Sequence, residues 1–382
     1  MRIKFKNTER QVQLLKDTVS KDKVKALTAQ EAFAALMQPV VNEVLQQADT
    51  TAGMWETFTF NEGDDPSLPL DPFRNLLDEY ISYWTQEVAG GLPRNHVSLP
   101  TDEIKFTTYN LDSAISWDKK FARKGRLDVI GGFLTRMVQE LLLKTNRNSW
   151  ATLMTSVANA SHNINGTASS HVFRATTTDA FNMDEMNYWF TLMRRLNASW
   201  ASGTPTESGR RLADLWCSPE FVEKIRSLAY NPVNTLGANN VAGTQYSGVV
   251  TLSEAQRQAL LNTAGAENFM GVNLNILDEL GEGTYKYNVL FNEAAGATTY
   301  SNKAAGGTAA FDHTAEEIVI GLGPGTVGFR PTEISDSEDN PSAFVLQPDD
   351  QYQTRSEKVG YYGKISLGHL IIDTRSQSGF II

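Results

Sequence analysis

The sequence predicts an α+β fold, and three observations support that prediction. Apolar residues recur at three- and four-residue spacing over 127–160 and 182–196, which is typical of amphipathic helices. In 54–60 (MWETFTF), large apolar and polar residues alternate instead, as they do in half-buried strands. Helical and extended segments are interleaved without the regular alternation of a doubly wound parallel sheet, so the class is α+β.

Bulk composition narrows the possible functions. A chain of 382 residues exceeds the size at which one core keeps growing, so two packed regions or an elongated subunit are expected. Its apolar stretches are much shorter than the roughly 20 residues that cross a bilayer, and the N-terminus has no apolar signal core. No membrane partner is therefore expected. Cys217 is the only cysteine, which fits assembly in a reducing cytoplasm.

The first 25 residues differ in charge from the rest of the chain. A net charge of -10 argues against a surface that wraps nucleic acid as a whole, so any DNA contact must be local. The local candidates form a basic arm: Arg2, Lys4, Lys6, Arg10 and Lys16, followed by Lys21, Lys23 and Lys25. A solvated helical face is the alternative interpretation of this charge run.

The arm continues as a helical segment over 8–48, with an expected interruption near Pro39. Its apolar stripe consists of Phe33, Leu36, Met37, Val40, Val41, Val44 and Leu45. A long excursion follows over 51–117. It holds the strand at 54–60, a second extended segment at 103–117 and, between them, several prolines and a short helix at 73–87.

Three aromatic residues at the start of this excursion are candidate subunit-interface anchors: Trp55, Phe58 and Phe60. An excursion of this length has few ways to bury large aromatic rings against itself, so a neighbouring subunit is the expected partner. The competing interpretation is that Trp55 belongs to the core of its own chain.

The strongest helical pattern covers 127–160 and predicts a spine helix about 50 Å long. The alternative is two helices that meet near 146–149. Further helices are expected from Asn182, with Glu185 completing a capping box, from Ser218 and Pro219, and over 253–265. Strands are expected at 272–278, 285–291, 317–322, 343–346 and 361–372.

No motif predicts catalysis or a cofactor. Gly323, Gly325 and Gly328 match GxGxxG, but a dinucleotide site needs a helix there, and FRPTEISDSEDNP follows. A strand and turn explain this motif better. Cys217 lies beside a helix start, which can lower a thiol pKa, but no neighbouring motif supports a nucleophile. Packing is the favoured role.

No metal site is predicted either. The histidines are scattered, without an HExxH pair or further cysteines. The acidic run Glu333, Asp336, Glu338 and Asp339 could attract calcium, but it lacks the glycine and ligand spacing of an EF-hand loop. A solvated acidic loop is the better interpretation, so the prediction is a non-enzyme with no cofactor and no metal.

Over essentially its whole length, the order of these parts resembles tailed-bacteriophage major capsid proteins of the Hong Kong 97-type fold. The closing sequence YQTRSEKVGYYGKISLGHLIIDTRSQSGFII is similar to the C-terminal peripheral-domain strand and tail of that family. The resemblance implies this division: an N-terminal arm at 1–50, an extended β-hairpin loop at 51–117, a peripheral domain at 118–182 and 343–382 containing the spine helix, and an axial domain at 183–342.

The resemblance also implies function and partners. It implies self-assembly as pentamers and hexamers into an icosahedral shell around double-stranded DNA, with the basic arm facing the interior and only weak, non-specific DNA contact. The implied location is the virion, after assembly in the host cytoplasm, with scaffolding, portal and decoration proteins as further partners. An encapsulin-like compartment of the same fold is the alternative.

The chain departs from the family pattern in two respects, and the segment 227–253 has an expected place in the assembled shell. The chain lacks the long charged N-terminal extension that some relatives use as a built-in scaffold, so a separate scaffolding protein is expected. No residue can be assigned to the Lys–Asn crosslinking of some relatives. The uncharged segment 227–253 is expected near the capsomer axis, where like charges would repel, although an ordinary surface loop fits equally well.

Overall fold

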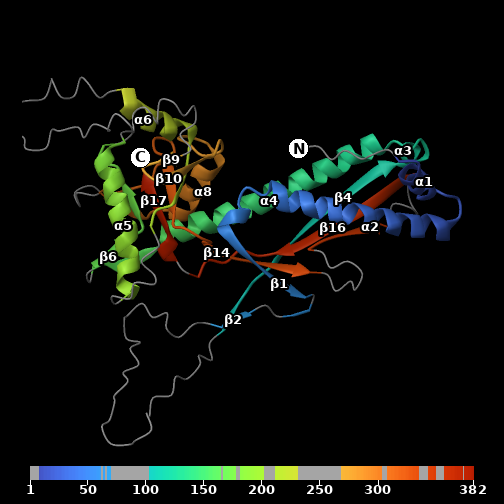
Figure 1. Cartoon of the computed structure of the whole chain (residues 1–382), viewed down its shortest axis with the longest axis horizontal. Coiled ribbons are helices and arrows are strands. Elements are labelled where there is room, and N and C mark those ends of the chain that lie inside the picture. The colour runs from blue at the N-terminus through green and yellow to red at the C-terminus, as the bar shows by residue number, and fades with distance from the viewer. Residues whose placement is uncertain are drawn as a thin grey trace, which may run out of the picture. The chain divides into compact units, whose positions relative to one another are not determined.

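The computed structural model describes residues 8–61, 63–64, 67–69, 103–164, 167–177, 181–201, 211–230, 268–302, 308–334, 343–349, 357–372 and 374–382. These residues form two compact units. Unit 1 contains the described residues up to 69, from 103 to 149 and from 328 to 370, and unit 2 contains those from 150 to 327 and from 371 to 382. Both units combine helices with sheets, which confirms the α+β class (Figure 1).

Unit 1 packs helices against a five-stranded sheet. Its helical elements are α1 (Glu9–Asp17), α2 (Lys23–Ala48), η1 (Ala52–Met54), α3 (Lys119–Arg123) and the first part of α4 (Leu127–Asn159). Its strands are β1 (Trp55–Asn61), β2 (Ser67–Pro69), β3 (Glu103–Lys105), β4 (Tyr109–Asp118), β14 (Gly328–Ile334), β15 (Phe344–Asp349) and β16 (Lys358–Leu367).

Helix α2 runs through Pro39 without a break, so the predicted interruption there is wrong. Proline removes one helical hydrogen bond, to the carbonyl four residues earlier at Ala35. Both Pro39 and Ala35 are exposed, so water can satisfy that carbonyl. The helical segment is interrupted between α1 and α2 instead. There Asp22 caps α2 by accepting a hydrogen bond from Val24 N at 3.1 Å.

The apolar stripe predicted on this segment is partly right. Phe33, Met37 and Val41 are buried in the unit 1 core, whereas Leu36 and Val40 remain 37% and 36% exposed. The buried side chains are spaced by four residues and thus share one narrow face. The predicted stripe was too wide, because it also included Leu36 and Val40, which lie outside that face.

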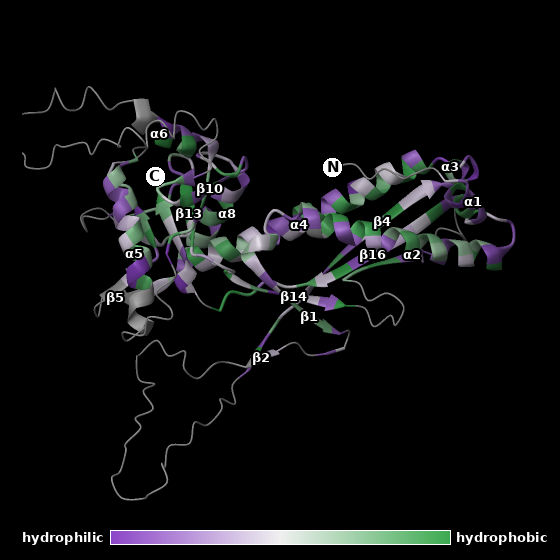
Figure 2. Cartoon of the chain, in the orientation of Figure 1, coloured by the Kyte–Doolittle hydropathy of each residue, from purple (hydrophilic) through white to green (hydrophobic). Residues whose placement is uncertain are grey.

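Helix α4 is continuous over 33 residues, which confirms the predicted long helix and excludes the two-helix alternative. Both hydrophobic and hydrophilic residues occur along its length (Figure 2). Its first part buries Ile130, Leu134, Met137 and Leu141 in the unit 1 core. Its last part buries Trp150, Leu153, Met154 and Val157.

Strand β16 organises the unit 1 sheet. It pairs antiparallel with β4 along its whole length, from Lys358↔Asp118 to Leu367↔Tyr109, and on its other edge with β15. Strand β14 joins that second edge through the pair Thr332↔Leu367, and β1 lies parallel to β14 at the end of the sheet. The two strands predicted to flank the excursion, β1 and β4, therefore do not pair with each other.

The pairing within the excursion is formed by β2 and β3, which are antiparallel from Ser67↔Lys105 to Pro69↔Glu103. The short helix predicted at 73–87 lies outside the described residues.

Unit 2 contains a six-stranded sheet in the order β7-β17-β13-β8-β10-β9. The strands of the whole unit, which include the separate pairs β5-β6 and β11-β12, are β5 (Ser161–Ile164), β6 (Thr167–Ser170), β7 (Val172–Arg174), β8 (Asp214–Cys217), β9 (Asn268–Phe269), β10 (Val272–Ile276), β11 (Thr299–Ser301), β12 (Thr308–Ala310), β13 (Ile318–Leu322) and β17 (Gln377–Ile381). Its helical elements are the last part of α4, α5 (Met183–Ala201), α6 (Pro219–Tyr230), α8 (Lys286–Ala295) and η3 (Thr374–Ser376).

Helix starts in unit 2 follow the predicted capping chemistry. Glu185 Oε2 accepts a hydrogen bond from Asn182 N at 3.2 Å, and Ser218 Oγ accepts one from Phe221 N at 3.0 Å. The helix predicted at 253–265 lies outside the described residues. The uncharged segment 227–253 also does, apart from its first residues, which end α6.

The strand predicted at 285–291 is wrong, because this segment forms helix α8. Tyr287, Phe291 and Ala295 recur every four residues and are buried on one face. Asn288 is also buried and donates from Nδ2 to Glu316 O at 2.9 Å. The alternation that suggested a strand ended after Phe291, whereas the helical spacing continues to Ala295.

The pairing of two strands that the sequence did not predict decides where the units divide. β14 pairs with β1 and β16 and belongs to unit 1, whereas β17 pairs with β7 and β13 and belongs to unit 2. In the C-terminal part of the chain, the boundaries between the units therefore fall at 327/328 and 370/371. Residues 150–182, assigned to the peripheral domain, also lie in unit 2. Long-range strand pairing decides these memberships, and local sequence patterns do not encode it.

Two glycines provide a test of core packing. A Cβ on Gly321 in β13 would lie 2.5 Å from the Trp189 ring and 2.6 Å from Leu212 Cδ1, whereas a Cβ on exposed Gly132 in α4 would meet nothing within 4 Å. We expect Gly321→Ala to lower the free energy of unfolding by about 1–3 kcal/mol through overpacking. Gly132→Ala should raise it by up to about 1 kcal/mol through helix propensity. Urea denaturation of both variants checks this, and equal effects would contradict the packing.

Candidate functional site

Trp55 lies in the interior of its own chain. Its side chain is 3% exposed, and its indole Nε1 donates to Ser149 Oγ at 2.6 Å. Its ring packs edge-on against His369, with 4.8 Å between the ring centroids. Trp55 is therefore a core residue of unit 1, and the prediction that it anchors a neighbouring subunit is wrong.

Phe58 and Phe60 lie farther along β1 and are half-buried. The Phe58 ring has a partner within its own chain, Phe106, at a centroid distance of 6.1 Å. Part of each ring's surface stays accessible, so their contact with a neighbouring subunit stays a prediction.

Next to Trp55 lies a cluster of polar side chains that we call the polar junction. It consists of Asp49, Thr51, Tyr109, Arg330 and His369. Arg330 Nη1 forms an ion pair with Asp49 Oδ2, and Nη2 donates to Thr51 Oγ1 at 3.0 Å. The third guanidinium nitrogen, Nε, donates to His369 Nε2 at 3.2 Å. Side-chain exposure is 11% for Arg330 and 4% for Asp49, so this is a buried, hydrogen-bonded charge pair.

The junction joins segments that are far apart in the sequence. Asp49 is the C-cap of α2, and its Oδ1 accepts hydrogen bonds from Thr51 N and Thr51 Oγ1, both at 2.8 Å. Arg330 comes from β14, Tyr109 from β4, and His369 follows β16. Each guanidinium nitrogen has a partner within the chain, so the arrangement suits a structural role more than ligand binding.

The hydrogen bonds fix the tautomer of His369. Arginine can only donate, so His369 Nε2 accepts and the ring proton lies on Nδ1. Nδ1 then donates to the Tyr109 hydroxyl at 2.9 Å. Burial, together with the nearby Arg330 charge, lowers the pKa of His369 to about 3, although Asp49 opposes the shift. His369 is therefore neutral near pH 7.

A groove of about 500 Å³ lies beside the junction. Its walls come from both α2 and α4 and from the strands of the unit 1 sheet. The residues are Asn42, Leu45, Asp49, Ala52, Thr57, Thr59, Leu142, Thr145, Arg330, Thr332, Ile334, Ala343, Ile365 and Leu367. Most of the wall is aliphatic or a threonine side chain, and Asn42, Asp49 and Arg330 are its other polar residues.

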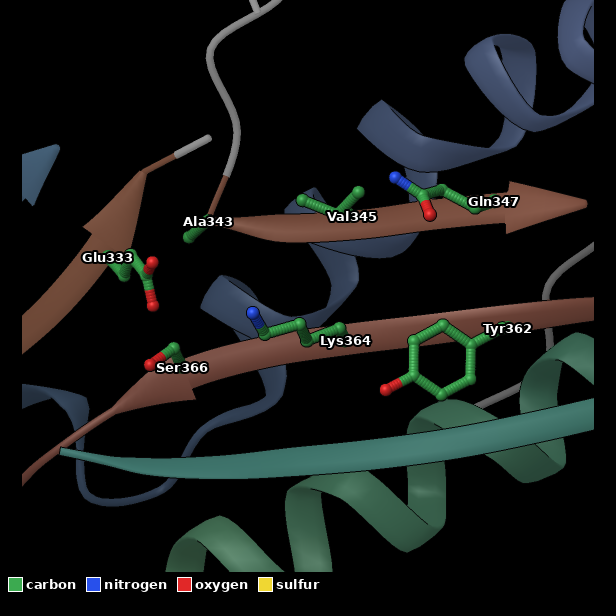
Figure 3. Close-up of a pocket in the computed structure, with 7 residues that line it drawn as sticks. All are labelled: Glu333, Ala343, Val345, Gln347, Tyr362, Lys364 and Ser366. Atoms are coloured by element: carbon green, nitrogen blue, oxygen red, sulfur yellow. The ribbon is translucent and has the colours of Figure 1, made fainter. Parts of the chain in front are cut away.

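A second, polar depression of about 250 Å³ lies where β14 diverges from β15 and β16. Figure 3 shows Glu333 on β14 and Lys364 on β16, both reaching into the space between the strands. The other lining residues are Ala343, Val345, Gln347, Tyr362 and Ser366. The lining therefore combines one carboxylate, one ammonium group and three neutral polar side chains with two aliphatic residues.

The basic arm is only partly described. Arg10 and Lys16 lie on α1 and are exposed, while Leu15 on the same helix is fully buried. Arg10 and Lys16 thus face solvent, while the apolar side of α1 packs in the core of unit 1. Arg2, Lys4 and Lys6 lie outside the described residues, so the interior-facing arm stays a prediction.

The remaining sequence candidates have structural roles. The glycines at 323–328 connect β13 to β14, with a strand and no helix after them, as predicted. Cys217 is buried, and desolvation raises its pKa to about 12, which contradicts the activated-thiol alternative. Within the described residues, no cluster of three or more histidine, cysteine, aspartate or glutamate side chains could hold a metal ion. No helix in the described part of the chain is long and apolar enough to cross a membrane.

Solved structures with a similar chain course exist, at low sequence identity. The capsid of the cyanophage P-SCSP1u is 10% identical, with 86% of each chain covered and a TM-score of 0.45. The capsid of a native GTA particle is 11% identical, with 87% of this chain and 90% of that chain covered and a TM-score of 0.46. The holo-SrpI encapsulin complex from Synechococcus elongatus PCC 7942 is 6% identical, with 86% and 84% covered and a TM-score of 0.41. No protein-family model matches the sequence. No curated protein matches it either.

His369 predicts a pH dependence of stability. Its pKa is about 3 in the folded chain and about 6.5 when unfolded, so between these values only the unfolded state takes up the proton. The contribution of neutral His369 to the free energy of unfolding should therefore be fully present above pH 6.5. It should fall by about 1.4 kcal/mol per pH unit below that value. Urea denaturation from pH 7.5 to 5 should show a loss about 2 kcal/mol larger in the wild type than in His369→Gln. His313→Gln, in unit 2, is the control. Parallel pH profiles for wild type and His369→Gln would contradict the assignment.

Proposed function

We propose that this chain is the major capsid (head) protein of a tailed bacteriophage, which assembles as pentamers and hexamers into an icosahedral shell around packaged DNA. The observation that carries the proposal is the order of parts along the chain. An arm of two helices, an excursion between β1 and β4, a 33-residue helix and a C-terminal return occur in the order of the Hong Kong 97-type fold.

The division into named domains is part of the proposal. The N-terminal arm is 1–50, and the extended loop is 51–117, with β2 and β3 at its base. Outside the arm and the loop, unit 1 then corresponds to the peripheral domain and unit 2 to the axial domain. The C-terminal chain contributes β16 to one sheet and β17 to the other, so it ties both units into one subunit.

The chemistry of the described residues supports a structural, non-catalytic role. The polar junction satisfies its own charges, the groove is lined mainly by aliphatic and threonine side chains, and Cys217 is buried with a raised pKa. Proteins that build closed shells need extended surfaces for copies of themselves more than a pocket for a substrate.

The partners follow from the same proposal. They are further copies of the chain, a scaffolding protein, a portal, decoration proteins and double-stranded DNA. The exposed Arg10 and Lys16 on α1 suit weak contact with phosphates inside a shell, while the net charge of -10 limits adhesion elsewhere. The expected location is the virion, after assembly in the host cytoplasm.

Electron microscopy of the expressed protein tests the proposal. We expect shells, rings or sheets of repeating subunits, with nuclease-protected DNA in particles that are filled in the host. Protein cargo in place of DNA would favour the encapsulin-like compartment instead. Uniform monomers at high concentration, with and without a scaffolding protein, would contradict both forms of the proposal.

A further inference from the structure

Strand β1 leaves one edge of the unit 1 sheet unpaired. It pairs with β14 on one side, in parallel register from Trp55↔Gly328 to Asn61↔Ile334, and no other described strand pairs with it (Figure 1). Beyond Trp55, its residues are exposed or half-buried. An edge of this kind displays free backbone N–H and C=O groups that can pair with another strand.

The other edge strands of this sheet carry protection that β1 lacks. β15 includes Pro348 and Asp349 and packs against α2. β4 carries Asp112 and Asp118, and charges on an edge discourage pairing with another strand. β1 contains no proline and no lysine, and its single charge, Glu56, lies near its start. The segment 57–61 is therefore the least protected edge of the described sheet.

The side chains of 57–61 are complementary to a second copy of themselves. In an antiparallel pair centred on Thr59, Phe58 faces Phe60 of the other copy, and Thr57 faces Asn61 of the other copy. Residues opposite each other in such a pair lie on the same face, so both aromatic contacts form together. In the same register Glu56 would face Glu62 of the other copy, so like charges flank the pair at both ends and limit it to the uncharged residues 57–61.

We infer that β1 is an intersubunit strand, in which residues 57–61 pair antiparallel with the same residues of a second copy across a two-fold axis. Such a contact is isologous and joins two unit 1 sheets into one continuous sheet. The inference deepens the proposed function and rests on it, because it names the surface through which copies meet. It also gives Phe58 and Phe60 a partner, while Trp55 remains inside its own subunit.

The start of β1 is held firmly in its own subunit, which supports this role. Trp55 is held by Ser149 and His369, and the strand follows Asp49 and Thr51 of the polar junction closely. Residues 57–61 are thus presented on a rigid base, which reduces the ordering cost of forming an intersubunit sheet.

Charge substitution at the axis tests the inference. Thr59→Lys places two ammonium groups opposite each other, and Thr59→Glu places two carboxylates there. We expect each variant alone to remain folded by circular dichroism but to lose at least tenfold in particle yield. Mixing the two variants should restore particles, because lysine then faces glutamate. The matched controls are Ala114→Lys and Ala114→Glu, exposed on β4 of the same sheet, which should assemble alone.

Crosslinking provides the second measurement. In a Cys217→Ser background, Thr59→Cys in assembled particles should give dimers with a short bis-maleimide, and Ala114→Cys should not. Wild-type particles are examined first, so a failure of the proposed function is seen as an absence of any assembly. If wild-type particles form but Thr59→Cys gives no dimers, or if Thr59→Lys assembles normally, the β1 pairing is overturned.

Discussion

The buried ion pair between Arg330 and Asp49 is the contact on which the architecture of unit 1 depends. It connects the end of α2, the start of the excursion, β14 and, through His369, the segment after β16. A buried pair is costly to desolvate and gives little net stability compared with apolar residues, but breaking it leaves an unpaired charge in the interior. The junction therefore acts mainly by making other arrangements of these segments costly.

This ion pair explains how the short strand β1 can be held rigidly and still offer an unpaired edge to another strand. At its start, β1 is fixed by the buried Trp55 and by the junction immediately before it. At its far end it has an unpaired edge, with half-buried aromatic rings on one face and threonines on the other. A shell subunit needs surfaces of this kind, since a contact repeated by symmetry must be presented in the same way by every copy.

Local patterns predicted much of the fold, and long-range contacts account for what they missed. The helix at 127–160 was predicted because its apolar period persists over many turns, and the starts at Asn182 and Ser218 because capping is local. The large aromatic ring of Trp55 marked it as buried but could not show which chain buries it. The polar junction was missed entirely, because its residues come from segments far apart in the sequence and no local pattern links Arg330 to Asp49. The strands β14 and β17 were not predicted, because their pairing partners lie far away in the sequence.

A double-mutant cycle on Arg330 and Asp49 tests the central claim most directly. Urea denaturation of Arg330→Met and Asp49→Leu should show a loss of about 3–5 kcal/mol each, because either change leaves the other charge unpaired. The double variant should lose at least about 2 kcal/mol less than the sum of the single losses. The exposed pair Arg136 and Glu140, with side chains 80% and 55% exposed, is the control and should couple by less than about 1 kcal/mol. Additive losses at Arg330 and Asp49, or single losses as small as the control, would contradict the account.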